Sequence, residues 1–110
     1  MPEKDEFALL NSIVGERLIG VQFIMDYFKL DFGVAEMTIL SPAWVSISGN
    51  EYPAFQYGFR DQICSSIGVK VDQANGVIEK SIDIMFEGDA SVIISLKIED
   101  RDGPEAVFSR

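Results

Sequence analysis

The chain has 110 residues, 47% of them hydrophobic and 25% charged, and a formal net charge of −9. These values are typical of one folded domain with a single core, and they argue against a disordered chain. The acidic excess disfavours nucleic acid and anionic membranes as partners, because both are polyanions that are bound by clusters of Lys and Arg. We expect one domain over residues 1–110, with an acidic loop and terminal segment at 99–110.

The start of the chain and its cysteine content favour a cytoplasmic protein. The first ten residues carry Glu3, Asp5 and Glu6, where a secretory signal would have a basic start and an apolar run. No apolar run approaches the roughly 20 residues of a membrane helix. The single cysteine, Cys64, excludes an internal disulfide, and its apolar neighbours predict a small packed side chain rather than a reactive thiol.

The first half, about residues 7–48, is predicted to be a short helix followed by strands. Apolar residues recur at helical spacing from Phe7 to Val14, and Gly15 is a natural helix stop. Alternating apolar and polar residues then predict strands at 19–23, 28–32, 37–39 and 44–47. We expect a hairpin turn at Met25 and Asp26, and we expect Pro42 to end or bend the third strand at a sheet edge.

The second half, about residues 57–98, follows a polar, turn-rich link over 48–53. Phe59, Ile63 and Ile67 form one helix face, which Gly68 ends. Val69 and Val71 begin a strand, after which Asn75-Gly76 predicts a type I′ turn. Alternation over 77–86 and again over 90–98 then predicts a hairpin that covers a core.

The two halves match one another along the sequence. Leu10, Ser12, Val14 and Gly15 correspond to Ile63, Ser65, Ile67 and Gly68 at a constant offset. One residue further on, Leu30-Asp31-Phe32 corresponds to Ile84-Met85-Phe86. The sequence therefore predicts a mainly β (α+β) fold, in which two pseudo-repeated helix-β-β-β halves pack as one sandwich or small barrel. The alternative is that β patterns of this length resemble each other by chance.

One combination of features resembles a group of small uncharacterised bacterial proteins built from a duplicated β unit. It comprises Ser66-Ile67-Gly68, two strands, the strand ends Leu30-Asp31-Phe32 and Ile84-Met85-Phe86, and the closing loop Gly103-Pro104-Glu105-Ala106. The resemblance spans most of the chain and implies the duplicated fold. It implies no catalytic residues.

Residues with catalytic or metal-binding patterns are scarce. Histidine is absent, which removes histidine bases, histidine-ligated zinc and Ser-His or Cys-His pairs. Asp100-Arg101-Asp102-Gly103 starts like a calcium loop, but its glycine is misplaced and the chain ends before the twelfth position. Asp31 and Asp83 are expected to be outward-facing strand charges. We therefore expect no catalytic residues, no metal and no cofactor.

Aromatic residues gather around the polar link between the halves. We expect Tyr27, Trp44, Tyr52, Phe55 and Tyr57 to form an interaction surface, with ordinary packing as the alternative. The leading functional hypothesis is a non-enzymatic protein-interaction domain. An immunity or inhibitor protein with a basic partner is one specific form of this hypothesis. The alternatives are a small-ligand-binding β-barrel and, more weakly supported, a carboxylate-based enzyme. A homodimer is also expected, through the odd strands that a small open sheet leaves and through the short apolar end Ala106 to Phe108, which we expect to pair across a twofold axis.

Overall fold

The computed structural model describes residues 9–77, 79–97 and 107–109. It is mainly β, with two antiparallel sheets, which confirms the predicted fold class at that level. Four predicted features lie outside the described residues: Phe7, Ile78, Ile98 and the acidic segment 99–106.

The four-stranded sheet is formed by the first hairpin, the strand that follows it and the end of the chain. Its order is β1 (Gly20–Ile24), β2 (Tyr27–Asp31), β3 (Glu36–Ile39) and β9 (Val107–Ser109). The predicted turn at Met25 and Asp26 is confirmed, because Ile24 pairs directly with Tyr27. β9 pairs with β3, so the two ends of this sheet come from opposite ends of the sequence.

The five-stranded sheet contains the second hairpin and also accepts a strand from the first half. Its order is β5 (Asn50–Pro53), β4 (Ala43–Ile47), β8 (Ala90–Ser95), β7 (Ser81–Phe86) and β6 (Val71–Val77). Between β3 and β4 the chain crosses from one sheet to the other at Leu40–Pro42. β3 lies between β2 and β9, so the expectation that Pro42 marks a sheet edge at the third strand is wrong.

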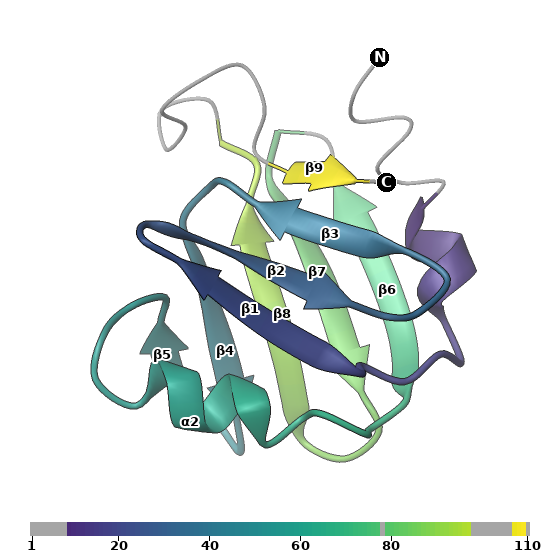
Figure 1. The fold of residues 1–110 in the computed structure, drawn as a ribbon, viewed down its shortest axis with the longest axis horizontal. Coiled ribbons are helices and arrows are strands. Elements are labelled where there is room, and N and C mark those ends of the chain that lie inside the picture. Colours follow the sequence, from purple (N-terminus) through teal and green to yellow (C-terminus); the bar gives the residue numbers. More distant parts are fainter. Residues whose placement is uncertain (1–8, 78, 98–106, 110) are drawn as a thin grey trace.

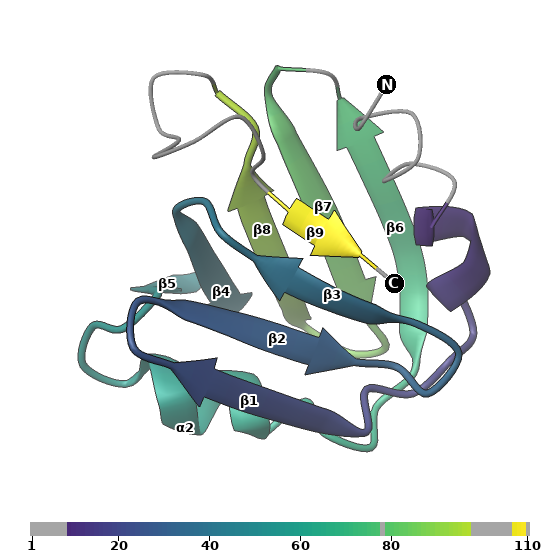
Figure 2. The same cartoon turned by 45° about the horizontal axis from the view of Figure 1, so that its top comes forward.

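The two sheets face one another with their strands crossing, as Figures 1 and 2 show. Side chains alternate along each strand, so one set points between the sheets and the other points outward. Inward side chains of both sheets, among them Phe28, Leu30, Ile84 and Val92, belong to one buried cluster. Burial of these apolar groups is the main force that holds the sheets together.

Two short helical segments border the sheets. Residues 9–13 are helical, and α2 (Phe59–Cys64) contacts β1, β4 and β5. The predicted helix stops are confirmed, because Gly15 and Gly68 follow the two helices with φ of 86° and 93°. Only glycine adopts this left-handed backbone readily.

Residues that follow the two helix stops pair with each other and join the two halves. Gly15 N donates to Val71 O at 2.8 Å, and Gly68 N donates to Leu18 O at 2.6 Å. Leu18 N donates to Val69 O at 3.1 Å, and Val71 N donates to Glu16 O at 2.9 Å. An antiparallel bridge between Arg17 and Lys70 lies at the centre of these bonds. We call this set of backbone bonds the junction.

Two elements differ from the prediction. Asn75 and Gly76 lie inside β6, paired with Asp83 and Ile82, so the predicted type I′ turn there is wrong. The hairpin instead turns after Val77, where Lys80 N donates to Val77 O at 3.0 Å. Residues 50–53 form β5 rather than a link without strands, because all four of them pair with β4.

Candidate functional site

Four phenylalanine rings pack together where the β1–β2 hairpin meets the segment that precedes α2. Phe28 and Phe59 are buried, with ring centroids 5.2 Å apart, and Phe23 contacts Phe59 edge-on at 6.1 Å. Phe55 contacts all three other rings at centroid distances of 6.0 to 6.4 Å. Edge-to-face packing of this kind adds to the stability gained from burial and fixes the position of each ring.

One residue of this cluster and one residue of the neighbouring hairpin turn have left-handed backbone. Phe55 has a φ of 63° and Met25, in the β1–β2 turn, has a φ of 43°. This region is favourable for glycine and asparagine but costs other residues of the order of 1–3 kcal/mol. Such strain is kept where the surrounding structure enforces it, and it gathers at functional sites.

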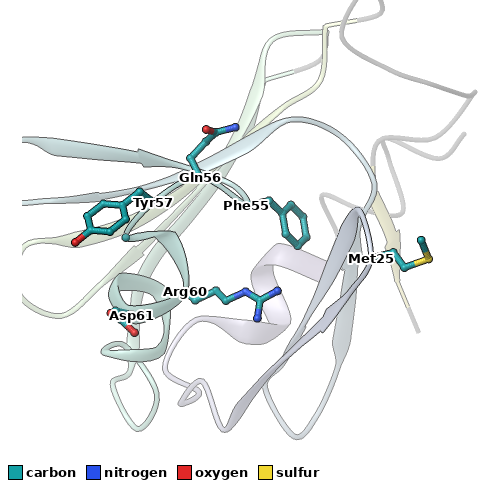
Figure 3. Close-up of a pocket in the computed structure, with 7 residues that line it drawn as sticks. Met25, Phe55, Gln56, Tyr57, Arg60 and Asp61 are labelled. Atoms are coloured by element: carbon teal, nitrogen blue, oxygen red, sulfur yellow. The ribbon is translucent and has the colours of Figure 1, made fainter.

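An open pocket of about 520 Å³ lies between the β1–β2 turn and the start of α2. It is lined by Met25, Phe55, Gln56, Tyr57, Gly58, Arg60 and Asp61, and we call it the turn pocket. Met25 is 94% exposed and Tyr57 is fully exposed, so two large side chains stand in solvent at one site. In Figure 3 Phe55 points into the space between the loop and the hairpin, whereas Tyr57 and Asp61 point to the other side.

Arg60 is the only cation among the described residues that line the turn pocket. It reaches from α2 toward the hairpin in Figure 3, and its guanidinium carbon lies 4.9 Å from the centre of the Phe23 ring. Among the described residues its nitrogens make no hydrogen bond and no ion pair. The ring face holds the charge in position, while the N–H groups stay free to bind a partner.

The five aromatic residues predicted as an interaction surface take up different positions. Phe55 and Tyr57 line the turn pocket, and Tyr52 lies beside it, since a Cβ on Gly58 would stand 3.0 Å from the Tyr52 ring. Trp44 lies on the outward side of β4, in the five-stranded sheet, because its neighbours Ala43 and Val45 are buried. Tyr27 lies on the outward side of β2, in the four-stranded sheet.

Sequence reasoning missed two residues of this pocket. Met25 was predicted only as a turn residue, although a two-residue hairpin turn favours Asn, Asp or Gly and a methionine there has no local advantage. That departure from turn chemistry was a readable signal. Arg60 carried none, because its position over Phe23 depends on how α2 packs against β1.

The two carboxylates that the sequence singled out, Asp31 and Asp83, lie apart in the structure. Asp31 and Asp83 lie on the outward sides of different sheets, and Asp31 Oδ1 accepts a hydrogen bond from Gly33 N at 2.8 Å. Within residues 9–77, 79–97 and 107–109, no three acidic, cysteine or histidine residues come close enough to hold a metal ion. The helices of that part are also too short and polar to cross a membrane.

Comparison of the chain with protein-family models, with curated proteins and with solved structures finds no match.

Proposed function

We propose that this chain is a non-enzymatic protein-interaction domain that binds its partner at the turn pocket. The observation that carries the proposal is the exposure of Met25 and Tyr57 on opposite sides of Phe55, whose backbone is left-handed. Large apolar and aromatic side chains at the centre of an interface supply most of the binding energy. Left-handed backbone also occurs at Ser48 and Glu79, but Met25 and Phe55 are the two bulky apolar residues that adopt it, which supports a role for the site beyond stability.

The charge of the chain supports a basic partner. A net charge of −9 attracts a cationic protein from a distance and repels nucleic acid and anionic surfaces. An immunity or inhibitor protein that faces a basic toxin or nuclease fits this balance, because steering of this kind speeds association. We place that specific role within the proposal, together with a cytoplasmic location.

We also infer that the fold is a duplicated unit packed as a sandwich. At one constant sequence offset, Gly15 is equivalent to Gly68 and Leu18 is equivalent to Val71. The bond from Gly15 N to Val71 O therefore has its counterpart in the bond from Gly68 N to Leu18 O, and the other two junction bonds match in the same way. The hairpins have equivalent register, since Val21 pairs with Leu30 as Ala74 pairs with Ile84.

The strand after each hairpin unit supports the same inference. β4 leaves the first half and pairs with β8, and β9 leaves the second half and pairs with β3. Each half thus gives its fourth strand to the sheet of the other half. A pair of units that exchange strands in this way depends on both copies for its core.

A small-ligand site is the second candidate function. The turn pocket has room for a ligand, and the free guanidinium of Arg60 suits a carboxylate. The interior gives this candidate no support, because inward side chains such as Leu30, Ile84 and Val92 are fully buried against one another. A carboxylate enzyme is the weakest candidate, since Asp31 and Asp83 share no cleft.

The proposal is tested by capture from cells that express the protein, with surface variants as bait. Met25→Asn introduces a residue that tolerates the left-handed backbone at this position, and Tyr57→Ser removes only an exposed ring. Both variants should therefore fold. Val34→Ser removes an exposed apolar residue between β2 and β3 and is the matched control.

We expect the wild type and Val34→Ser to retain the same basic protein, and the two pocket variants to lose it. Purified components should then show at least about a tenfold weaker Kd for Met25→Asn and Tyr57→Ser. Equal binding by all four baits would rule out the turn pocket as the interaction site.

A further inference from the structure

The outward side of the five-stranded sheet carries a row of three half-buried residues on neighbouring strands. Trp44 on β4 is in register with Ile93 on β8, and Ile93 is in register with Asp83 on β7. We call these residues the Trp44 row. Adjacent strands are about 4.8 Å apart, so the Cα atoms of Trp44 and Asp83 are about 10 Å apart, with Ile93 between them.

Polar atoms at both ends of this row lack partners. Asp83 Oδ1 and Trp44 Nε1 are buried, and neither makes a hydrogen bond in the described part of the chain. A buried carboxylate oxygen without a donor is costly, and buried polar atoms are nearly always paired in folded proteins. The indole is therefore held by packing alone, and the carboxylate lacks the donor that it needs.

The sheet around the row contains no cation. None of the strands β4 to β8 includes Lys or Arg, whereas Glu51, Asp72 and Asp83 bring three carboxylates. The other sheet differs, since the outward Lys29 lies 3.8 Å from Glu36. The four-stranded sheet thus gives one of its two carboxylates a counter-ion, whereas Asp83 in the five-stranded sheet makes no ion pair with any described residue.

We propose that the Trp44 row binds an arginine side chain of a basic protein partner. The guanidinium lies over Ile93, stacks against the indole of Trp44 and donates to the oxygen of the Asp83 carboxylate other than Oδ1, because Oδ1 itself is buried in a side chain that is only half-buried. A span of about 10 Å between the two end residues suits a planar group that contacts a ring on one side and a carboxylate on the other. This inference rests on the proposed function, because it names the partner chemistry of a protein-binding domain.

The Trp44 row and the turn pocket are linked by a short stretch of the chain. Pro53 on β5 is in register with Trp44, and Phe55 of the turn pocket follows two residues later.

The Trp44 row should prefer arginine to lysine, because the flat guanidinium of arginine stacks on a ring and binds a carboxylate with two N–H groups, whereas an ammonium group does neither.

The test uses the fluorescence of Trp44, which is the single tryptophan of the chain. The full-length protein is titrated with an amidated tri-arginine peptide, and with a tri-lysine peptide of equal charge. We expect a saturable change in emission with tri-arginine, and at least about a threefold weaker Kd for tri-lysine.

Variants separate the row from general charge. Asp83→Asn should weaken tri-arginine binding about tenfold, since it removes a charge-assisted hydrogen bond while keeping the shape. Glu87→Gln removes one negative charge from an exposed side chain beyond the end of β7, and it should change the Kd less than about twofold. Asp83→Ser serves if the Asn variant does not fold, and thermal unfolding of each variant is measured first.

The inference is overturned if tri-arginine causes no saturable change, or if Asp83→Asn and Glu87→Gln weaken binding equally. Its failure is distinguishable from failure of the proposed function. A natural partner that needs Met25 and Tyr57 but binds Asp83→Asn normally would leave the turn pocket standing and remove the arginine site. An arginine site that depends on Asp83, in a chain that captures no partner through Met25, would do the reverse.

Discussion

Single residues of the core fix how the two sheets pack, and Ile84 is the clearest case. It lies on β7, fully buried, in register with Ala74 on one side and Val92 on the other. We expect Ile84→Ala to lower the free energy of unfolding by about 2–5 kcal/mol, because the lost methyl groups leave a cavity. Chemical denaturation measures this change. Ile19→Ala is the control, since Ile19 is 56% exposed, and an equal loss in both variants would place Ile84 outside the core.

Gly58 precedes α2 in a left-handed conformation and also lies against a ring. Its φ is 87°, and an added Cβ would lie 3.0 Å from Cδ1 and 3.3 Å from Cε1 of Tyr52. Gly49 has a φ of 85° and open space around it. We expect Gly49→Ala to cost about 1–2 kcal/mol from backbone strain alone, and Gly58→Ala to cost about 1–3 kcal/mol more from overpacking. Equal costs in equilibrium denaturation would mean that the Tyr52 ring moves away freely.

Sequence patterns predicted which residues face the core more reliably than they predicted the turn pocket. Alternation alone placed Leu30, Ile84 and Val92 inside, because burial of one strand face follows from a two-residue period. The turn pocket depends on contacts between segments far apart in sequence. Arg60 over the Phe23 ring is such a contact, and no local pattern specifies it.

At the scale of elements, the junction is the connection on which both sheets depend. Its bonds join the segment before β1 to the segment before β6, so breaking them separates the two halves. We expect the amides of Leu18 and Val71 to exchange with solvent only on global unfolding, with protection equal to that of the central strands. The amide of Gln56, which donates to Pro53 O in an exposed turn, should exchange at least about a hundredfold faster. Native-state hydrogen exchange decides this, and fast exchange at Leu18 would show that the halves open separately.

The misplaced hairpin turn illustrates why element boundaries need tertiary contacts. Asn75-Gly76 is the dipeptide that best fits a type I′ turn, yet both residues pair with β7. A turn there would leave the inward Ala74 without its partner Ile84, so packing of the sheet overrides the local preference. The sequence also did not predict that β4 and β9 join the sheet of the other half, because nothing within either strand specifies the sheet to which it belongs.

For the whole molecule, open strand edges favour self-association. β1 and β9 end one sheet, and β5 and β6 end the other. β5 carries both a charge, Glu51, and a proline, Pro53, whereas β6 carries the charge of Asp72 but no proline, so β6 is the edge that we expect to pair across a twofold axis. Sedimentation equilibrium should show a dimer at high protein concentration. Ala74→Lys would disturb the core, so Asn75→Lys, which adds a charge at an exposed edge position, is the variant that should return the protein to a monomer. A monomeric wild type would dispose of the homodimer.

Charge should mainly change the association rate, because its field extends beyond the interface. Apolar contacts act only within the interface, so they should mainly change the dissociation rate. The field of a molecule with a net charge of −9 reaches a basic partner over about 10 Å at 0.1 M salt and over less as salt rises. We expect the association rate to fall about tenfold between low and high salt, with little change in dissociation. Trp44→Ala should chiefly speed dissociation, since its ring is not screened. Stopped-flow kinetics with the identified partner measures both rates, and an association rate that does not respond to salt would leave the acidic composition with a role in solubility alone.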